Sequence, residues 1–160
     1  MKRVVEVASE ADTAALAQSF ADACEESVLV GLSGTLGAGK TFFVRHFASR
    51  FGVEPDIVVS PTFTLCNEYN AARKIYHLDL YRVNDEDEFF ELGVEEMCSS
   101  GSVVFIEWSD RFLAHLPPNR IDITIEIVNA EQRRFCFEST GHATDSILRS
   151  LSSVTDESCD

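Results

Sequence analysis

Apolar residues along the chain switch between the spacing of helices and the spacing of buried strands. Residues 9–24 repeat apolar positions every three or four residues, which predicts a helix that Ser9 and Asp12 cap at its start. The continuous apolar run at residues 28–32 is typical of a strand buried on both faces. Residues 40–51 return to the helical spacing. The first third of the chain is therefore predicted as helix, strand and helix.

The middle of the chain alternates apolar and polar residues, as half-buried strands do. Residues 63–83 hold two such segments around a short polar connection and predict a hairpin. The period of two places His77, Asp79 and Tyr81 on one face of its second strand. The acidic segment 85–96 predicts a helix whose early carboxylates suit the positive end of its dipole. This segment is expected to be a solvated face, with docking of a basic partner as the alternative.

The last part of the chain predicts a buried strand followed by two half-exposed ones. Residues 103–107 form a buried run with Glu107 at its C-terminal end, where α/β sheets present their chemistry. Residues 120–128 alternate isoleucines with polar residues, and residues 133–139 follow after a short turn. These two segments are therefore expected to pair as antiparallel strands. A short helix is expected at residues 144–151.

Size and cysteine content predict one domain that needs neither disulfide bonds nor a structural metal. A chain of 160 residues can bury a substantial core on its own, so residues 1–151 are expected to form a single domain. Residues 152–160 are polar and acidic and are expected to be a disordered tail. The cysteines show no C-x-x-C pair and are expected to be reduced thiols. They are Cys24, Cys66, Cys98, Cys136 and Cys159.

Charge narrows the classes of partner. The sequence has 27 acidic and 13 basic residues and a formal net charge of -14. Such a surface has no general attraction for a nucleic-acid backbone, so any role with nucleic acid is expected to pass through a partner. No apolar run reaches about 18 residues, which predicts no membrane span. Acidic residues interrupt the first segment, unlike a signal peptide, and a cytoplasmic protein is expected.

The segment GTLGAGKT joins the first buried strand to the second helix. It satisfies the pattern G-x-x-x-x-G-K-[ST] of phosphate-binding loops. Its glycines let backbone N–H groups converge on phosphate oxygens, Lys40 reaches the terminal phosphates, and Thr41 offers its hydroxyl to Mg²⁺. The residues expected to bind the nucleotide here are Gly34, Leu36, Gly37, Ala38, Gly39, Lys40 and Thr41.

Two carboxylates are candidates for chemistry beside that loop. Glu107 ends an apolar run, where a carboxylate holds Mg²⁺ directly or through water, although a plain surface glutamate is the alternative. Asp79 lies in a strand built to be buried, where an unpaired carboxylate would be costly. A metal, a basic partner such as Arg82 or a catalytic water each account for it. Which carboxylate contacts the metal stays open.

Two further polar residues lie near these carboxylates in the predicted fold. Thr62 follows Ser60 and Pro61 in a loop before the hairpin. It either senses the terminal phosphate, as switch-loop threonines do, or forms a turn. His77 shares the face of Asp79 and is expected to be a hydrogen-bonded histidine rather than a general base.

Five motifs in register resemble the TsaE (YjeE) family of small bacterial P-loop ATPases. They are GTLGAGKT, SPTFTL with NEYN, YHLDLYRV, ELG within the acidic segment, and IEW. The resemblance covers about residues 28–128. It implies an α/β fold with a P-loop NTPase core, a mostly parallel sheet flanked by helices, and added antiparallel strands. It also implies an ATPase that uses ATP and Mg²⁺ and works with the TsaD and TsaB proteins to make threonylcarbamoyladenosine on tRNA.

Roles carry over from this resemblance position by position. Thr62 matches the threonine of the family's SPT segment, and Asp79 matches the acid of its H-x-D-x-Y-R motif. Glu107 and Trp108 match the acid and the tryptophan of its I-E-W motif. Thr62, Asp79 and Glu107 are thus the expected catalytic residues, Thr41 and Glu107 the expected metal residues, and Trp108 an expected nucleotide-binding residue.

The chain also departs from the family pattern in and after the loop. Thr35 stands where the family usually has Asp or Glu, Phe42 where it has a second threonine, and His46 where it has glycine. The resemblance therefore implies neither a carboxylate within the loop nor a helper hydroxyl after Thr41.

Two other functions stay open from the sequence. One is a nucleotide-gated binding module with negligible turnover, in which the loop around Thr62 changes order with the bound nucleotide. The other is a small-molecule kinase, which needs basic groups from a closing lid. The stretch after Glu107 offers only Arg111 and Arg120 before a regular strand, so a kinase is the less favoured alternative.

Overall fold

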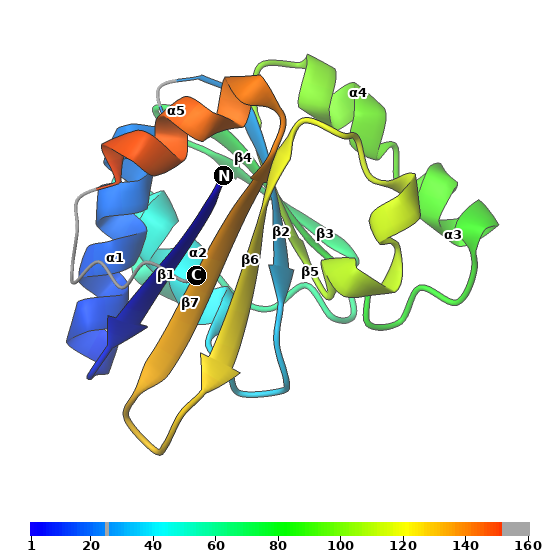
Figure 1. Ribbon diagram of the computed structural model, residues 1–160. Helices are drawn as coiled ribbons and strands as arrows, with labels where there is room; N and C mark the ends of the chain where they lie inside the picture. The colour runs from blue at the N-terminus through cyan, green and yellow to red at the C-terminus, as the bar shows by residue number, and fades with distance from the viewer. Residues whose placement is uncertain (25, 152–160) are drawn as a thin grey trace.

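The described residues form a seven-stranded sheet with helices on both faces (Figure 1). The computed structural model describes residues 1–24 and 26–151; the predicted tail at residues 152–160 lies outside the described residues. The strands are β1 (Lys2–Val7), β2 (Val28–Ser33), β3 (Cys66–Asn70), β4 (Lys74–Asp79), β5 (Val103–Glu107), β6 (Arg120–Ile127) and β7 (Arg133–Thr140). The helices are α1 (Glu10–Ala23), α2 (Lys40–Ser49), α3 (Glu86–Glu91), α4 (Val94–Ser99) and α5 (His142–Ser150). Three short 3₁₀ turns are η1 (Pro55–Ile57), η2 (Ser109–Arg111) and η3 (Leu113–His115).

Parallel pairing is confined to the centre of the sheet. The strand order is β1-β7-β6-β2-β5-β4-β3, and β6, β2, β5 and β4 pair in parallel. The outer pairings, β3 with β4, β6 with β7 and β1 with β7, are antiparallel. This arrangement confirms the predicted α/β fold with a mostly parallel core and added antiparallel strands.

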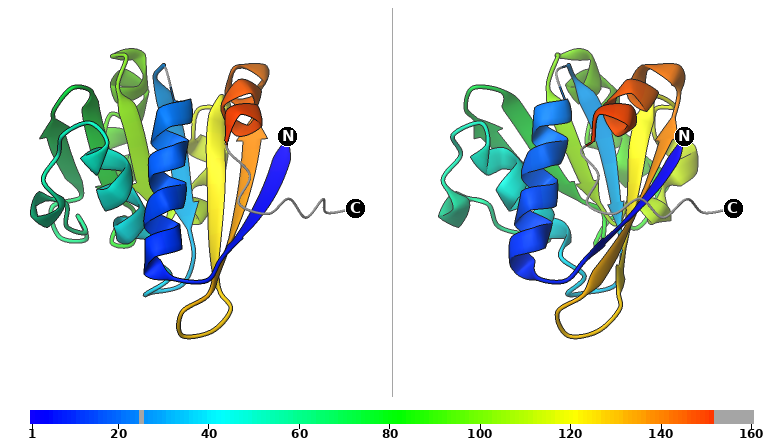
Figure 2. Two further views of the ribbon diagram at one scale, coloured as in Figure 1. Left: turned by 90° about the vertical axis from the view of Figure 1, so that its left-hand side faces the viewer. Right: turned by 60° about the vertical axis from the view of Figure 1, so that its left-hand side comes forward.

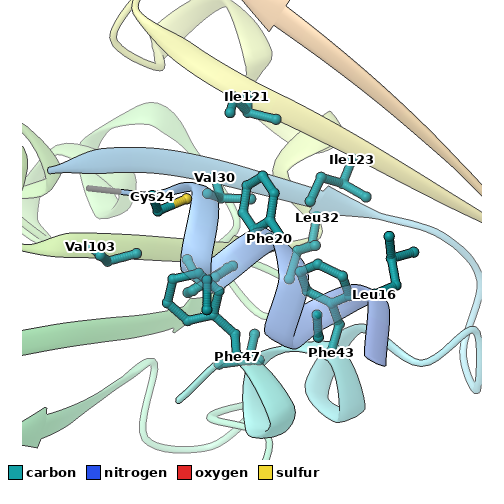
Figure 3. Close-up of a cluster of buried hydrophobic side chains, with 14 of the residues drawn as sticks. Leu16, Phe20, Cys24, Val30, Leu32, Phe43, Phe47, Val103, Ile121 and Ile123 are labelled. Atoms are coloured by element: carbon teal, nitrogen blue, oxygen red, sulfur yellow. The ribbon is translucent and has the colours of Figure 1, made fainter. Parts of the chain in front are cut away.

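Two apolar layers hold the helices to the sheet. Helices α1, α2 and α5 cover one face, as the two views of Figure 2 show. Phenylalanines such as Phe20, Phe43 and Phe47 fill this layer (Figure 3). The ring of Phe20 lies 5.9 Å from that of Phe47, and Phe47 meets Phe105 edge-on at 4.7 Å. On the other face the rings of Phe89 and Phe112 stack at 5.4 Å. Because helices cover both faces of the sheet, β2 and β5 are apolar along most of their length, up to Ser33 and Glu107 at their C-terminal ends.

Local sequence signals place the first helix. Ser9 Oγ accepts a hydrogen bond from the Asp12 N–H, and Asp12 Oδ2 accepts one from the Ala8 N–H. These bonds satisfy backbone donors at the helix start, as the predicted capping pair requires.

In the described part of the chain no helix has the length and apolarity needed to cross a membrane.

Two elements differ from the sequence prediction. The first residues form an edge strand, β1, which buries only Val5 and Val7 and pairs with β7. The acidic segment forms two short helices rather than one, because Gly93 adopts a φ of 72° and begins a new helix, α4.

Of the cysteines, the four described ones are free thiols, and burial raises the pKa of Cys24 to about 12.

Candidate functional site

The loop between β2 and α2 depends on its glycines for two different reasons. Gly34, Gly37 and Gly39 have φ angles of 151°, 80° and 109°, which residues with a Cβ rarely adopt. Gly34 is also closely packed, since a Cβ there would lie 2.7 Å from the Ile125 carbonyl oxygen. A Cβ at Gly37 or Gly39 would meet nothing within 4 Å. Conformation alone therefore selects glycine at those two positions.

Replacing Gly34 by alanine is expected to destabilise the protein more than the same change at Gly37. Both substitutions strain a positive φ, but only the one at Gly34 also drives a methyl group into backbone. We expect losses in the free energy of unfolding of about 2–3 kcal/mol for Gly34→Ala and about 1 kcal/mol for Gly37→Ala. Urea unfolding of both variants checks this order, and equal stabilities would contradict it.

Lys40 is the first residue of α2 and lies almost completely buried above the loop. Its Nζ donates hydrogen bonds to the carbonyl oxygens of Gly34, at 2.6 Å, and Thr35, at 3.1 Å. The same Nζ lies 4.0 Å from the centre of the Trp108 ring. Burial lowers the pKa of Lys40, and the nearby carboxylates, Glu107 first among them, oppose that shift.

Trp108 is held at the end of β5 in an unusual backbone conformation. Its φ is 59°, in the left-handed region that non-glycine residues rarely enter. Its ring contacts both Lys40 and Tyr81, and the Tyr81 ring centre lies 5.1 Å away. Strain of this kind persists where the surroundings fix a functional geometry. Trp108 therefore lies beside Lys40, the other residue of this pair that was expected to bind the nucleotide.

Glu107 is the centre of a chain of hydrogen bonds that runs into the core. Its Oε1 accepts from the Thr41 hydroxyl at 2.6 Å and lies 2.7 Å from His77 Nε2. The Tyr69 hydroxyl lies 2.9 Å from His77 Nδ1. A carboxylate only accepts, so His77 donates to Glu107 from Nε2 and uses Nδ1 for its hydrogen bond with Tyr69. His77 is fully buried and uses both ring nitrogens, as a hydrogen-bonded histidine does.

Asp79 anchors the loop that holds Thr62. Its Oδ2 accepts from the hydroxyls of Ser60, at 3.2 Å, and Thr62, at 3.0 Å. Its Oδ1 accepts from the Tyr81 backbone N–H at 2.8 Å. Of the three alternatives offered for Asp79, the pairing with Arg82 is not formed, because the Arg82 guanidinium lies over the Phe63 ring. Two hydroxyl groups and a backbone N–H satisfy the oxygens of this buried carboxylate.

These groups line one cavity with a volume of about 340 Å³. Neighbouring parallel strands present the two acids together, since Asp79 and Glu107 are paired in register on β4 and β5. The predicted residues in the wall are Leu36, Gly37, Ala38, Gly39, Lys40, Thr41, Thr62, Asp79, Glu107 and Trp108. Gly34 is outside the wall, and its carbonyl oxygen binds Lys40.

Other parts of the wall were not predicted from the sequence. They are Glu10, Thr13, Phe42, Ser60, Ala130, Glu131 and Arg133. The start of α1 and the turn between β6 and β7 reach the cavity only through tertiary packing, for which local spacing carries no signal. Arg133 Nε donates to the Ala38 carbonyl oxygen at 3.2 Å, which ties that turn to the loop. Phe42 was noticed only as a departure from the family pattern, and its ring packs at 4.5 Å on that of His46.

The oxygen donors of the cavity fit a magnesium ion that also binds phosphate. Among the described residues no three His, Cys, Asp or Glu side chains gather as a metal cage. Thr41 Oγ1 and Glu107 Oε1 lie 2.6 Å apart at the start of α2. Mg²⁺ takes one or two protein oxygens and completes its shell with phosphate oxygens and water. This donor set suits that mode of binding.

Comparison with known proteins identifies the family. The family model described as "Threonylcarbamoyl adenosine biosynthesis protein TsaE" matches residues 7–135. The chain belongs to the TsaE family. A TsaE protein from Rickettsia conorii is 39% identical over 144 residues, which are 89% of this chain and 81% of that protein. The Bacillus subtilis TsaE protein is 35% identical over 142 residues, which are 88% of each.

A solved structure supports the same assignment. The crystal structure of Bacillus subtilis YdiB matches with a TM-score of 0.76 and 29% identity, over 94% of both chains. The resemblance seen in the five motifs is thus confirmed, and it extends beyond residues 28–128. The TsaE family is named for threonylcarbamoyl adenosine biosynthesis.

Proposed function

We propose that the chain is a Mg²⁺-dependent ATPase that acts with TsaD and TsaB proteins in the threonylcarbamoyladenosine modification of tRNA. Membership of the TsaE family supports the pathway. One observation carries the activity: Lys40 and Thr41 of the phosphate-binding loop share a cavity with two buried carboxylates, Asp79 and Glu107. A nucleotide site needs the first pair, and hydrolysis also needs the second.

The groups that bind phosphate in this proposal are already gathered around the loop. Lys40 exchanges its bonds to the Gly34 and Thr35 carbonyl oxygens for bonds to the terminal phosphates. Thr41 and Glu107 would hold Mg²⁺, which when bound offsets the negative charge on the phosphates. Backbone N–H groups at the start of α2 add their dipoles to the same end of the cavity.

Thr62 and Asp79 connect the nucleotide to a movable loop in this account. The Thr62 hydroxyl is hydrogen-bonded to Asp79, and Thr62 lines the cavity. When Thr62 turns toward the terminal phosphate, an Asp79 oxygen is freed to accept a proton from the attacking water. Hydrolysis then breaks the bond between the γ-phosphorus and the bridging oxygen. The products are ADP and phosphate.

The charge of the chain favours a partner protein over direct contact with RNA. A net charge of -14 gives no attraction for the tRNA backbone, so tRNA enters this proposal only through the complex. The charge does not identify the partner. TsaD and TsaB are proposed from the family alone.

A nucleotide-gated module is the second candidate, and the contact of Thr62 with Asp79 favours it. Such a module needs only that this bond form or break with the nucleotide, without turnover. The kinase has no comparable support. Arg111 donates to the Leu80 carbonyl oxygen and Arg120 pairs with Asp122, and neither arginine lines the cavity.

Stimulation by partners is the result expected of the ATPase. Hydrolysis of ATP with Mg²⁺ is measured for the purified chain alone, and then with TsaB, TsaD and tRNA. We expect slow turnover alone and stimulation of about tenfold or more in the full mixture, because a partner completes the groups around the transferred phosphate. Tight, partner-dependent binding of ATP without turnover in any mixture would favour the gated module instead.

A further inference from the structure

The cavity has a second wall that the phosphate chemistry leaves unused. It consists of Glu10 and Thr13 from α1, Phe42 from α2, Ala130 and Glu131 from the turn between β6 and β7, and Arg133 at the start of β7. None of these groups has a part in the roles proposed for Lys40, Asp79 and Glu107. Since ligand cavities hold about 300 Å³ or more, a volume of about 340 Å³ leaves space beyond a phosphate chain.

Charge decides which end of a nucleotide this wall receives. Glu10 and Glu131 are exposed carboxylates in the wall, and they disfavour phosphate there. The cation of this wall, Arg133, is outnumbered by them, and its guanidinium already donates to backbone carbonyl oxygens. The ammonium of Lys40 and the start of α2 attract phosphate at the loop. The phosphates of a nucleotide therefore lie along the loop, and its nucleoside extends toward Phe42.

We propose that the base of the bound nucleotide lies against the ring of Phe42. This inference rests on the proposed function, because it assumes a nucleotide in the cavity. Phe42 is half-buried and follows Thr41, so its ring borders the cavity directly beyond the loop. His46, one turn along α2, packs on that ring with 4.5 Å between ring centres and supports it.

Another part of the cavity wall, at the start of β7, is fixed to the loop. Arg133 Nε donates to the Ala38 carbonyl oxygen, and its Nη1 donates to the carbonyl oxygens of Asn129, at 2.8 Å, and Gln132, at 3.0 Å. These bonds tie the turn between β6 and β7 to the loop, and the turn lines the same cavity as Phe42. A flat aromatic base is the ligand chemistry that such a ring takes, because stacking needs no particular pattern of hydrogen bonds.

Phosphate-only ligands separate this role from a structural one. We would measure the binding of ADP and of inorganic tripolyphosphate to the unchanged protein, Phe42→Ala and Phe42→Trp by calorimetry. Phe42→Ala is expected to weaken the binding of ADP about tenfold or more and to leave the binding of tripolyphosphate unchanged, because only ADP carries a base. Phe42→Trp keeps a ring and is expected to keep most of the ADP affinity. The matched control is Phe90→Ala, at an exposed phenylalanine of α3 outside the cavity.

The outcomes distinguish the inference from the function on which it rests. Unchanged ADP binding in Phe42→Ala would overturn the stacking role while leaving the ATPase intact. Equal weakening of ADP and tripolyphosphate would also overturn it, because that result places the defect in the loop. If the unchanged protein binds ADP no more tightly than tripolyphosphate, the base has no site and the inference fails. Binding of neither ligand would overturn the proposed function itself.

Should Phe42→Ala unfold, His46→Ala provides a second reading. Removal of the His46 ring leaves Phe42 in place but less firmly packed. The affinity for ADP should therefore fall by about two- to fivefold. Tripolyphosphate binding is again expected to be unchanged. An ADP affinity equal to that of the unchanged protein would contradict support of Phe42 by His46.

Discussion

Replacement of Glu107 by glutamine is expected to slow ATP hydrolysis about 100-fold or more while the protein stays folded. Glutamine keeps the shape of the side chain but removes the charge that would offset Mg²⁺. It also weakens the acceptor shared by the Thr41 hydroxyl and His77 Nε2. Turnover is measured in the partner-stimulated assay, and ADP affinity in the same preparation shows that the site remains formed.

A matched change outside the cavity controls for loss of charge in general. Glu91→Gln removes one carboxylate from an exposed position of α3 and should leave hydrolysis unchanged. Asp79→Asn should resemble Glu107→Gln, because Asp79 both holds the Thr62 loop and faces the cavity. Full turnover in both cavity variants would remove the two acids from the mechanism.

Replacement of Lys40 by alanine is expected to weaken the binding of ATP and ADP by about 10- to 150-fold. The ammonium is the one charged donor that the loop brings to the phosphates, and its removal costs charge-assisted hydrogen bonds. The bonds from Nζ to the Gly34 and Thr35 carbonyl oxygens are lost as well. Calorimetric titration with ADP measures the change, and circular dichroism confirms that α2 remains folded.

The exposed Lys74 on β4 offers the corresponding control. It pairs with Glu68 on the neighbouring strand and lies outside the cavity. Lys74→Ala also lowers the positive charge of the protein by one, so it should leave nucleotide affinity unchanged. Equal affinities for Lys40→Ala and the unchanged protein would mean that phosphate does not bind at this loop.

Hydrophobic spacing was sufficient to predict the central elements. The apolar runs of β2 and β5 are read directly, because helices cover both faces of these strands. The start of α1 was predicted from Ser9 and Asp12, which form the expected cap. The loop from Gly34 to Thr41 was recognised because each fixed position has a local chemical reason.

Elements and contacts that depend on distant partners could not be predicted this way. Strand β1 buries only Val5 and Val7 and exists because β7 pairs with it, so its own six residues carry little signal. The break at Gly93 was hidden within a continuous acidic pattern. The hydroxyl partners of Asp79 lie 19 and 17 residues earlier, and the sequence left a metal, Arg82 and a catalytic water as open alternatives.

The cavity itself illustrates the same limit. Its acids were found from strand-end patterns, but the register that pairs Asp79 with Glu107 is a property of the folded sheet. Thr13 and Arg133 come from segments 120 residues apart and meet the loop only after α1 and the strands β6 and β7 pack. A single sequence carries no spacing rule for such contacts.

The most direct test of the central claim is formation of threonylcarbamoyladenosine on tRNA in a reconstituted mixture with TsaD, TsaB and ATP. The yield is compared without this chain, with the unchanged chain and with Glu107→Gln. We predict sustained formation of modified tRNA only with the unchanged chain, because Glu107→Gln is expected to bind nucleotide but to hydrolyse it about 100-fold more slowly. Equal yields with the unchanged chain and Glu107→Gln would contradict the account, since modification would then proceed without hydrolysis in this cavity.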